Sequence, residues 1–123
     1  MSASASERPW PSELRVNAAR DGLTVSFDSA ERHELPAEYL RVESPSAEVQ
    51  GHGPLERQLV AKKRHVRIAR LEPVGHYAVR IVFDDGHDTG LFTWAYLLEL
   101  GRAREEKWQA YLEALAAKGL PRD

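Results

Sequence analysis

The chain has 123 residues, with 17 lysines and arginines, 19 aspartates and glutamates, and no cysteine. A chain of this length is expected to form one domain with a core of its own. The lack of cysteine excludes disulfides, thiolate metal sites and cysteine nucleophiles. The formal net charge of -2 creates no field that would favour nucleic acid or an anionic membrane.

The first residues, 1–11 (MSASASERPWP), have neither the basic start nor the apolar centre of a secretory signal. Their serine, alanine and proline content predicts a disordered lead-in. No apolar run in the chain approaches the roughly 20 residues of a membrane-spanning helix. We therefore expect a cytoplasmic protein without a membrane partner.

Alternating apolar residues predict strands at 13–18 and 23–27, joined by a turn in which Gly22 takes a positive φ. A short third strand is expected at 32–35, followed by one or two helical turns at 36–43. These elements form a hairpin that leads into a helix.

Residues 44–54 (SPSAEVQGHGP) contain little that could enter a core, so they predict a loop. Loops of about a dozen residues without secondary structure often have a function. The following residues, 55–63, fit either an extended segment or a single helical turn.

The second half predicts strands at 65–71 and 76–83, separated by a turn at 72–75. The segment 88–92 is expected to pair back on the second of these strands as a hairpin. Period-two alternation places four apolar residues of the best strand on one face: Tyr77, Val79, Ile81 and Phe83.

Two helices are expected at the end of the chain. Thr93 is a good N-cap for a helix that ends near Gly101. The second helix, 104–119, has an apolar stripe of Trp108, Tyr111, Leu112 and Leu115. The fold class that follows is α+β: a small twisted antiparallel β core of two hairpin-helix units with C-terminal helices.

Two segments of the chain, 27–40 and 83–97, resemble each other. With one extra residue in the second segment, the matched residues are Phe27 and Phe83, Asp28 and Asp84, Leu35 and Leu91, and Tyr39-Leu40 and Tyr96-Leu97. The similarity indicates either an ancient duplication or two ordinary hairpin-to-helix units that look alike.

The turn at 84–88 (DDGHD) raises the question of what His87 does. An aspartate that leads a turn caps backbone N–H groups, so Asp84 and its counterpart Asp28 are interpreted as structural. Gly86 is expected to supply a positive φ. The first segment has Glu31 where the second has His87, so the repeated pattern does not require a histidine there.

Motifs for familiar enzyme chemistry are missing from the sequence. None of the five histidines is followed two residues later by an acid, so the 2-His-1-carboxylate pattern of iron oxygenases is lacking. There is also no G-x-S-x-G elbow and no P-loop. A zinc site from His33, His52 and His87 could arise only in three dimensions, and Asp84 with Asp85 is the one candidate acid/base pair.

The basic run 62–70 could touch phosphate or an acidic partner, but strand-edge lysines that block aggregation explain it equally. A nucleic-acid partner is not expected.

Three stretches together resemble the gamma-butyrobetaine hydroxylase-like N-terminal domain family, also called DUF971. They are the N-terminal hairpin, LPAEYLRVESPSAEVQGHGP and VGHYAVRIVFDDGHDTGLFTWAYLLELG. The resemblance covers residues 12–101, which leaves 102–123 as a C-terminal helix packed on the same domain. The chain looks like the small stand-alone bacterial members.

The resemblance implies the kind of metabolism in which the domain acts, but not a reaction that it catalyses. Large relatives carry an iron(II)/2-oxoglutarate oxygenase domain after this domain, and others are fused to P-loop carriers of iron–sulphur clusters. The oxygenase domain is lacking here, so hydroxylase activity is not implied. The structural zinc of the hydroxylases is held by three cysteines and a histidine, whose positions correspond to Ser44, Ser46, Val49 and His87, so three of the four ligands are missing.

The leading functional prediction is a non-catalytic binding or adaptor domain with a protein partner, linked to iron or iron–sulphur metabolism through the resemblance. The alternative is a small iron- or zinc-binding module that uses His87 and His52. An enzyme that uses Asp84, Asp85 and His87 ranks last. The residues expected on the binding surface are Ser44, Ser46, Glu48, Gly51, Gly53, Asp85, Asp88 and Trp94.

Overall fold

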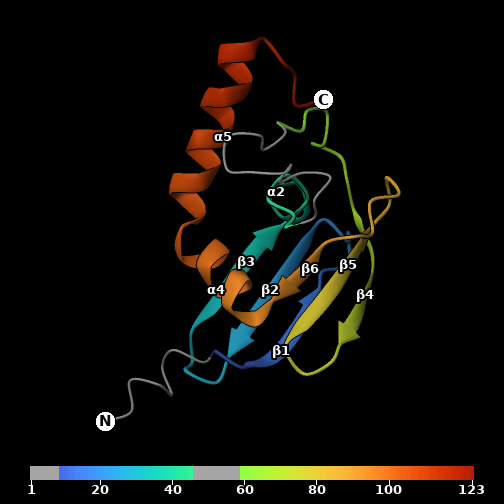
Figure 1. Ribbon diagram of the computed structural model, residues 1–123, viewed down its shortest axis with the longest axis vertical. Helices are drawn as coiled ribbons and strands as arrows, with labels where there is room; N and C mark the ends of the chain where they lie inside the picture. Colours follow the sequence, from blue (N-terminus) through green and yellow to red (C-terminus); the bar gives the residue numbers. More distant parts are fainter. Residues whose placement is uncertain (1–8, 46–58) are drawn as a thin grey trace.

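The computed structural model describes residues 9–45 and 59–123 (Figure 1). Its elements are β1 (Pro11–Val16), β2 (Gly22–Phe27), β3 (Arg32–Pro36), α2 (Ala37–Val42), β4 (Ile68–Val74), β5 (Ala78–Phe83), β6 (Leu91–Thr93), α4 (Trp94–Arg102) and α5 (Arg104–Lys118). The strands form two three-stranded antiparallel sheets, β1-β2-β3 and β4-β5-β6. The expected α+β class is confirmed.

The first unit is a three-stranded meander followed by α2. Leu23 of β2 pairs with Leu35 of β3, and both side chains are buried, as the alternation predicted. The turn between β1 and β2 differs from the expectation, because the positive φ belongs to Arg20 (64°) and not to Gly22. The side-chain oxygen of Asn17 accepts the Asp21 N–H at 3.0 Å and stabilises this turn.

The second unit is a meander followed by α4, but its first strand is shifted along the chain. β4 begins at Ile68 and continues through Pro73, which pairs with Val79, so the turn expected at 72–75 is wrong. Proline is tolerated there because β4 is an edge strand. The turn lies further on, where Gly75 has a φ of 55°, and Tyr77 is 55% exposed instead of lying in the apolar face.

The two similar segments of the sequence correspond to β3-α2 and β6-α4. Leu35 and Phe92 each lie two residues before their helix and are both buried, whereas Leu91 is exposed. The structural counterpart of Leu35 is therefore Phe92 and not Leu91. The extra residue of the second segment belongs to the turn before β6, and the duplication stays a hypothesis.

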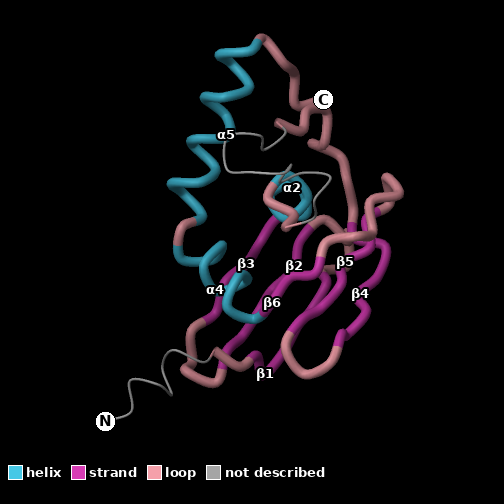
Figure 2. The backbone as a smooth tube through the Cα atoms, in the orientation of Figure 1, coloured by secondary structure: helices cyan, strands magenta, loops and turns pink. Residues whose placement is uncertain are grey.

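Both sheets, α2 and α4 share one hydrophobic core, whereas Tyr111 and Leu115 of α5 form a second buried cluster with Val42. The buried members of the shared core include Val25 and Phe27 from β2, Ile81 and Phe83 from β5, and Leu97 from α4. β5 is buried on both faces, which explains its long apolar run. Figure 2 shows α2 at one end of the strands and α5 along the side of the molecule.

The helix ends agree with the sequence prediction. The Thr93 side chain accepts the Tyr96 N–H and caps α4, and Gly119 ends α5 with a φ of 64°. Of the expected apolar stripe, Tyr111 and Leu115 are buried. No helix in the described ranges is long and apolar enough to cross a bilayer.

The ends of the described chain are held by contacts. Pro11 already pairs with Phe27 in β1, and residues 1–8 of the expected lead-in lie outside the described residues. At the other end, the Lys62 N–H donates to the Pro121 carbonyl and the Arg64 N–H to the Arg122 carbonyl. The segment after α5 therefore pairs with the residues that lead into β4.

Candidate functional site

The turn between β5 and β6 places His87 inside the protein. Gly86 has a φ of 93°, as the sequence predicted, and the Phe83 N–H donates to the His87 carbonyl at 3.0 Å. His87 is only 5% exposed, and the centroid of its imidazole lies 6.1 Å from that of the Phe83 ring. His87 is therefore part of the interior and not a residue of an open turn.

The buried partner of His87 is Ser44, the second residue after α2. The Ser44 Oγ and the His87 Nε2 are 2.9 Å apart, and the serine is completely buried. Gly90 makes room for it, because a Cβ at that position would lie 2.3 Å from the Ser44 Oγ. The contact joins the two halves of the fold.

Asp85 forms a charged cluster beside this pair. Its Oδ2 accepts from the Arg41 Nε at 2.8 Å and from the Lys63 Nζ at 2.6 Å, while its Oδ1 accepts the His87 N–H at 3.1 Å. Burial acts to raise the pKa of Asp85, but the hydrogen bonds from Lys63, His87 and Arg41 outweigh it and lower the pKa to about 2. The carboxylate is thus ionised at neutral pH.

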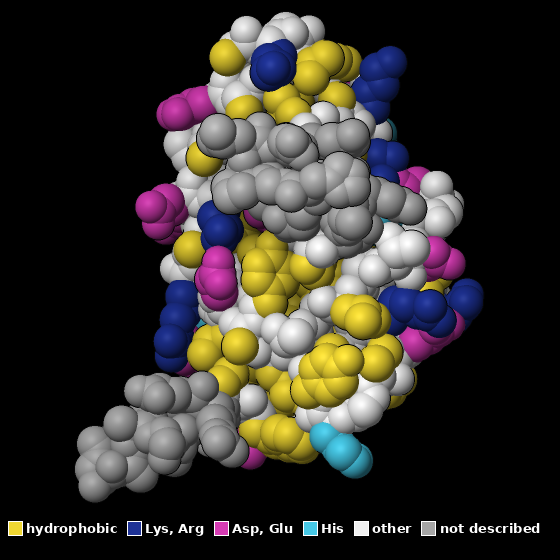
Figure 3. Space-filling model, in the orientation of Figure 1, with side chains coloured by type: hydrophobic (Ala, Val, Ile, Leu, Met, Phe, Trp, Pro, Cys, Tyr) yellow, Lys and Arg dark blue, Asp and Glu magenta, His cyan; other side chains and the backbone are white. Residues whose placement is uncertain are grey.

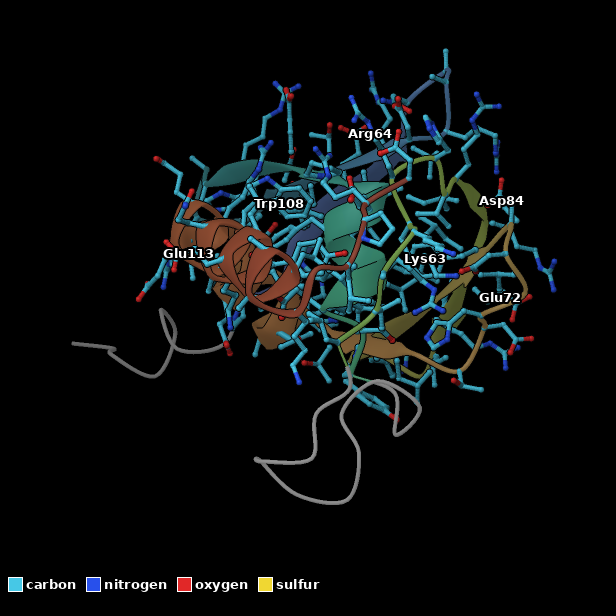
Figure 4. The ribbon with its side chains drawn as sticks, turned by 90° about the horizontal axis from the view of Figure 1, so that it is seen from above. Lys63, Arg64, Glu72, Asp84, Trp108 and Glu113 are labelled. Carbon is cyan, nitrogen blue, oxygen red and sulfur yellow. The ribbon has the colours of Figure 1, made fainter. Side chains whose placement is uncertain are left out.

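Asp84 has a structural role, but not the one expected. Its Oδ1 accepts the Arg67 N–H at 3.0 Å, and its own N–H donates to the Arg67 carbonyl at 2.9 Å. It therefore ties the turn to the residue before β4, while Asp85 caps the turn. Figure 4 shows Lys63 and Asp84 on the side of the molecule away from α5.

His33 belongs to a separate cluster on β3. Its Nε2 lies 2.9 Å from the Glu31 carboxylate, which also accepts two hydrogen bonds of 2.8 Å from Arg102. The imidazole packs against Gly101, where an added Cβ would lie 2.4 Å from the ring. His33 therefore helps to fix α4 on β3.

The remaining predicted site residues are dispersed. Ser44 lies beneath the surface, so its expected place on a binding surface is wrong. Asp88 is exposed, and Trp94 is partly buried and donates its indole N–H to the His76 carbonyl at 2.8 Å. The others lie outside the described residues: Ser46, Glu48, Gly51, His52 and Gly53.

No group of three or more histidine, aspartate or glutamate side chains that could hold a metal ion occurs within 9–45 and 59–123. Arg41 and Lys63 were not predicted as part of the site. Lys63 lies in the basic run noted in the sequence, but only the fold shows that its partner is Asp85.

The model of the family described as gamma-butyrobetaine hydroxylase-like, N-terminal, matches residues 14–98. The chain belongs to this family. No curated protein matches the chain.

Solved structures of small proteins agree with this assignment. One NMR solution structure is 46% identical to this chain with a TM-score of 0.81, and the match covers 94% of this chain and 91% of that chain. A second NMR solution structure is 44% identical with a TM-score of 0.81, over 95% of this chain and 87% of that chain. A crystal structure from Acidithiobacillus ferrooxidans is described as a protein of unknown function of the DUF971 family. It is 40% identical with a TM-score of 0.62, over 74% of this chain and 91% of that chain.

The family resemblance implied ligand positions at Ser44 and His87, and the structure places these two side chains in contact. Serine is a poor zinc ligand at neutral pH. In this family member, a hydrogen bond between the two side chains joins α2 to the β5-β6 turn. The other two implied positions, Ser46 and Val49, lie outside the described residues.

Proposed function

We propose that this protein is a non-catalytic domain that binds a protein partner through the exposed apolar surface beside β6. The observation that carries the proposal is the exposure of two large apolar side chains, Tyr77 (55%) in the turn before β5 and Leu91 (40%) on β6. Large apolar side chains that gather on a surface mark interaction sites. We call Tyr77, Leu91 and Trp94 the β6 surface.

Backbone and side-chain contacts hold the β6 surface in place. The Trp94 N–H donates to the Tyr77 carbonyl at 3.1 Å, and the Trp94 indole donates to His76. β6 is the last strand of its sheet, with Leu91 opposite Arg80 of β5. Figure 3, in the same orientation as Figure 1, shows hydrophobic side chains gathered on the lower part of the molecule, below the level of the β6 label. Rigid aromatic side chains of this kind lose little entropy on binding.

The contacts of the 84–88 turn favour binding over catalysis. His87 is buried against Ser44, and Asp85 is ionised and held by two cations. A general base or acid needs access to substrate and a pKa near the working pH. Both groups instead stabilise the junction between the two halves of the fold.

The proposed class of partner rests on the family resemblance noted in the sequence. Relatives that join this domain to oxygenases or to carriers of iron–sulphur clusters support a partner in iron or iron–sulphur protein metabolism. Asp88, at the exposed end of the 84–88 turn, interacts electrostatically with Arg80, which lies opposite Leu91, so charged residues lie beside the β6 surface.

Site-specific cross-linking in cells tests the proposal. A photoreactive residue at Tyr77 should capture a defined protein, and the same residue at the exposed Glu113, which points away from the body of the molecule on α5 (Figure 4), should not. The double variant Tyr77→Ser/Leu91→Ser should lose the captured partner while it remains folded. Identical capture from both positions would refute the β6 surface as the docking site.

The second candidate is the metal-binding module with His87 and His52, because two positions that the family resemblance assigns to metal ligands, Ser44 and His87, lie next to each other. Its test is the metal content of the purified protein, followed by anaerobic Fe(II) and Zn(II) titration. Stoichiometric binding that is lost in His87→Ala would replace the adaptor proposal, whereas metal-free protein with no binding at micromolar metal would remove the second candidate.

A further inference from the structure

A second surface, remote in sequence from β6, lies between α5 and the residues that precede β4. It is an apolar groove of about 440 Å³. Leu59 and Val60 form one wall, and the Tyr111 hydroxyl fixes that wall by donating to the Val60 carbonyl at 2.7 Å. Tyr111 and Val42 belong to a buried cluster beneath it.

The other wall is a single stripe of α5. Its residues are Lys107, Ala110, Ala114 and Lys118, which follow one another at intervals of three and four. The two alanines are small, so the middle of the stripe is hollow and its two ends are lysines. From Lys107 to Lys118 the helix rises roughly 16 Å, about three helical turns.

The positive charges at the two ends of the groove favour a partner with negatively charged residues. Lys107 forms a long ion pair, in which its Nζ lies 3.4 Å from the carboxylate of the exposed Glu99. Lys118 is exposed at the other end. The acidic lining residue, Glu43, is buried with 8% exposure, so the accessible charge of the groove is positive.

We propose that the groove binds an amphipathic helix of a partner protein, with apolar residues on one face and acidic residues near both ends. The apolar face would pack on Ala110, Ala114 and Leu59, and the acidic residues would pair with Lys107 and Lys118. A groove with an apolar floor and charged ends is the usual receptor for such a helix. This site does not depend on the β6 surface.

The test uses the full chain and synthetic helical peptides of about 14 residues with leucines at i, i+3, i+4 and i+7. One peptide carries glutamates near both ends, and its matched control carries lysines there. Two-dimensional NMR should show binding of the acidic peptide with shifts at Ala110 and Ala114. The lysine peptide should bind about tenfold more weakly.

Matched variants of α5 decide whether the groove is responsible. Ala110→Arg should weaken the acidic peptide at least about tenfold, and Ala116→Arg, on another face of α5, should leave its affinity unchanged. The pair Lys107→Glu/Lys118→Glu should reverse the preference towards the lysine peptide. Circular dichroism confirms folding, since Ala110 and Ala116 are both exposed.

Several results would overturn the proposal. Equal affinities for the two peptides, no binding of either, or no effect of Ala110→Arg would do so. A concentration-dependent dimer that Ala110→Arg dissociates would assign the groove to a second copy of the chain. Binding that appears only when residues 46–58 are replaced by a glycine-serine linker would assign it to that segment.

Discussion

Ser44 and His87, 43 residues apart in the sequence, are joined by a buried hydrogen bond of 2.9 Å between the Oγ and the Nε2. The serine follows α2 in the first unit, and the histidine lies in the turn before β6 in the second. The contact therefore reports whether the two units are docked. The family resemblance implied metal-ligand positions at these two residues, and in the structure their side chains share a hydrogen bond.

Loss of the Ser44 hydroxyl is expected to lower the free energy of unfolding by about 1–2 kcal/mol, because the buried His87 Nε2 loses this hydrogen bond. A double-mutant cycle with Ser44→Ala and His87→Ala, measured by urea denaturation, should give a coupling energy of roughly 0.5–1.5 kcal/mol. Strictly additive effects would show that the two side chains do not stabilise each other.

Gly90→Ala should destabilise the protein by about 1–3 kcal/mol, because its Cβ would overlap the Ser44 Oγ. The same substitution should cost less in a Ser44→Ala background, where the oxygen is gone. Some cost should remain, since the Cβ would also lie 3.1 Å from the Phe92 ring. Thermal unfolding of the four proteins measures both effects, and an equal cost in both backgrounds would contradict the steric explanation.

Much of the fold could be predicted because its signals are local. Alternation identified β2 and β5, Thr93 marked the start of α4, and Gly119 marked the end of α5. The errors arise where tertiary position overrides a local signal. A proline normally ends a strand because it has no N–H to donate to the neighbouring strand. β4 is an edge strand, so it can continue through Pro73 without losing a hydrogen bond within the sheet.

The candidate site was predicted less completely. The family resemblance linked Ser44 with His87. No local pattern in the sequence shows that the serine is buried or that the two side chains form a hydrogen bond. Arg41 and Lys63 each converge on Asp85 from distant parts of the chain. Contacts of this kind depend on how the units dock and leave no periodic signal in the sequence.

Asp85→Asn should reveal how much the charge of Asp85 contributes to the free energy of unfolding, a contribution that is lost at acidic pH. The pKa of Asp85 is lowered to about 2 in the folded protein, below the usual value near 3.8. A lowered carboxylate pKa stabilises the fold above the unfolded pKa, and the stabilisation is lost as the pH falls from about 4 to about 2. With allowance for solvent screening, we expect a loss of about 1 kcal/mol at pH 7.

The measurement is urea denaturation of both proteins from pH 7 to pH 2. The difference between their free energies of unfolding should become much smaller at the acidic end, because near pH 2 about half of the wild-type carboxyl is protonated and uncharged. Asparagine still offers an oxygen to the His87 N–H, so the difference reports on Arg41 and Lys63. A difference that is constant with pH would show that charge is not its origin.

Arg122 is expected to fasten the segment after α5 to α2. It donates two hydrogen bonds, of 3.0 and 2.8 Å, to the Glu38 carboxylate, and its guanidinium carbon lies 5.3 Å from the centroid of the Trp108 ring. Figure 4 shows Trp108 between α5 and α2. Arg122→Gln should lower the free energy of unfolding by about 1–3 kcal/mol, since the buried Glu38 loses its cation.

Two further variants separate the unpaired charge from the lost geometry. Glu38→Gln/Arg122→Gln should be more stable than Arg122→Gln alone, because no uncompensated carboxylate remains in the interior. Arg122→Lys keeps the charge but cannot form the two-pronged contact or stack as a plane on Trp108, so it should lie between wild type and Arg122→Gln. If Arg122→Lys matches wild type in urea denaturation, a point charge suffices. If the double variant is less stable than Arg122→Gln, the unpaired carboxylate is not the cause of the loss.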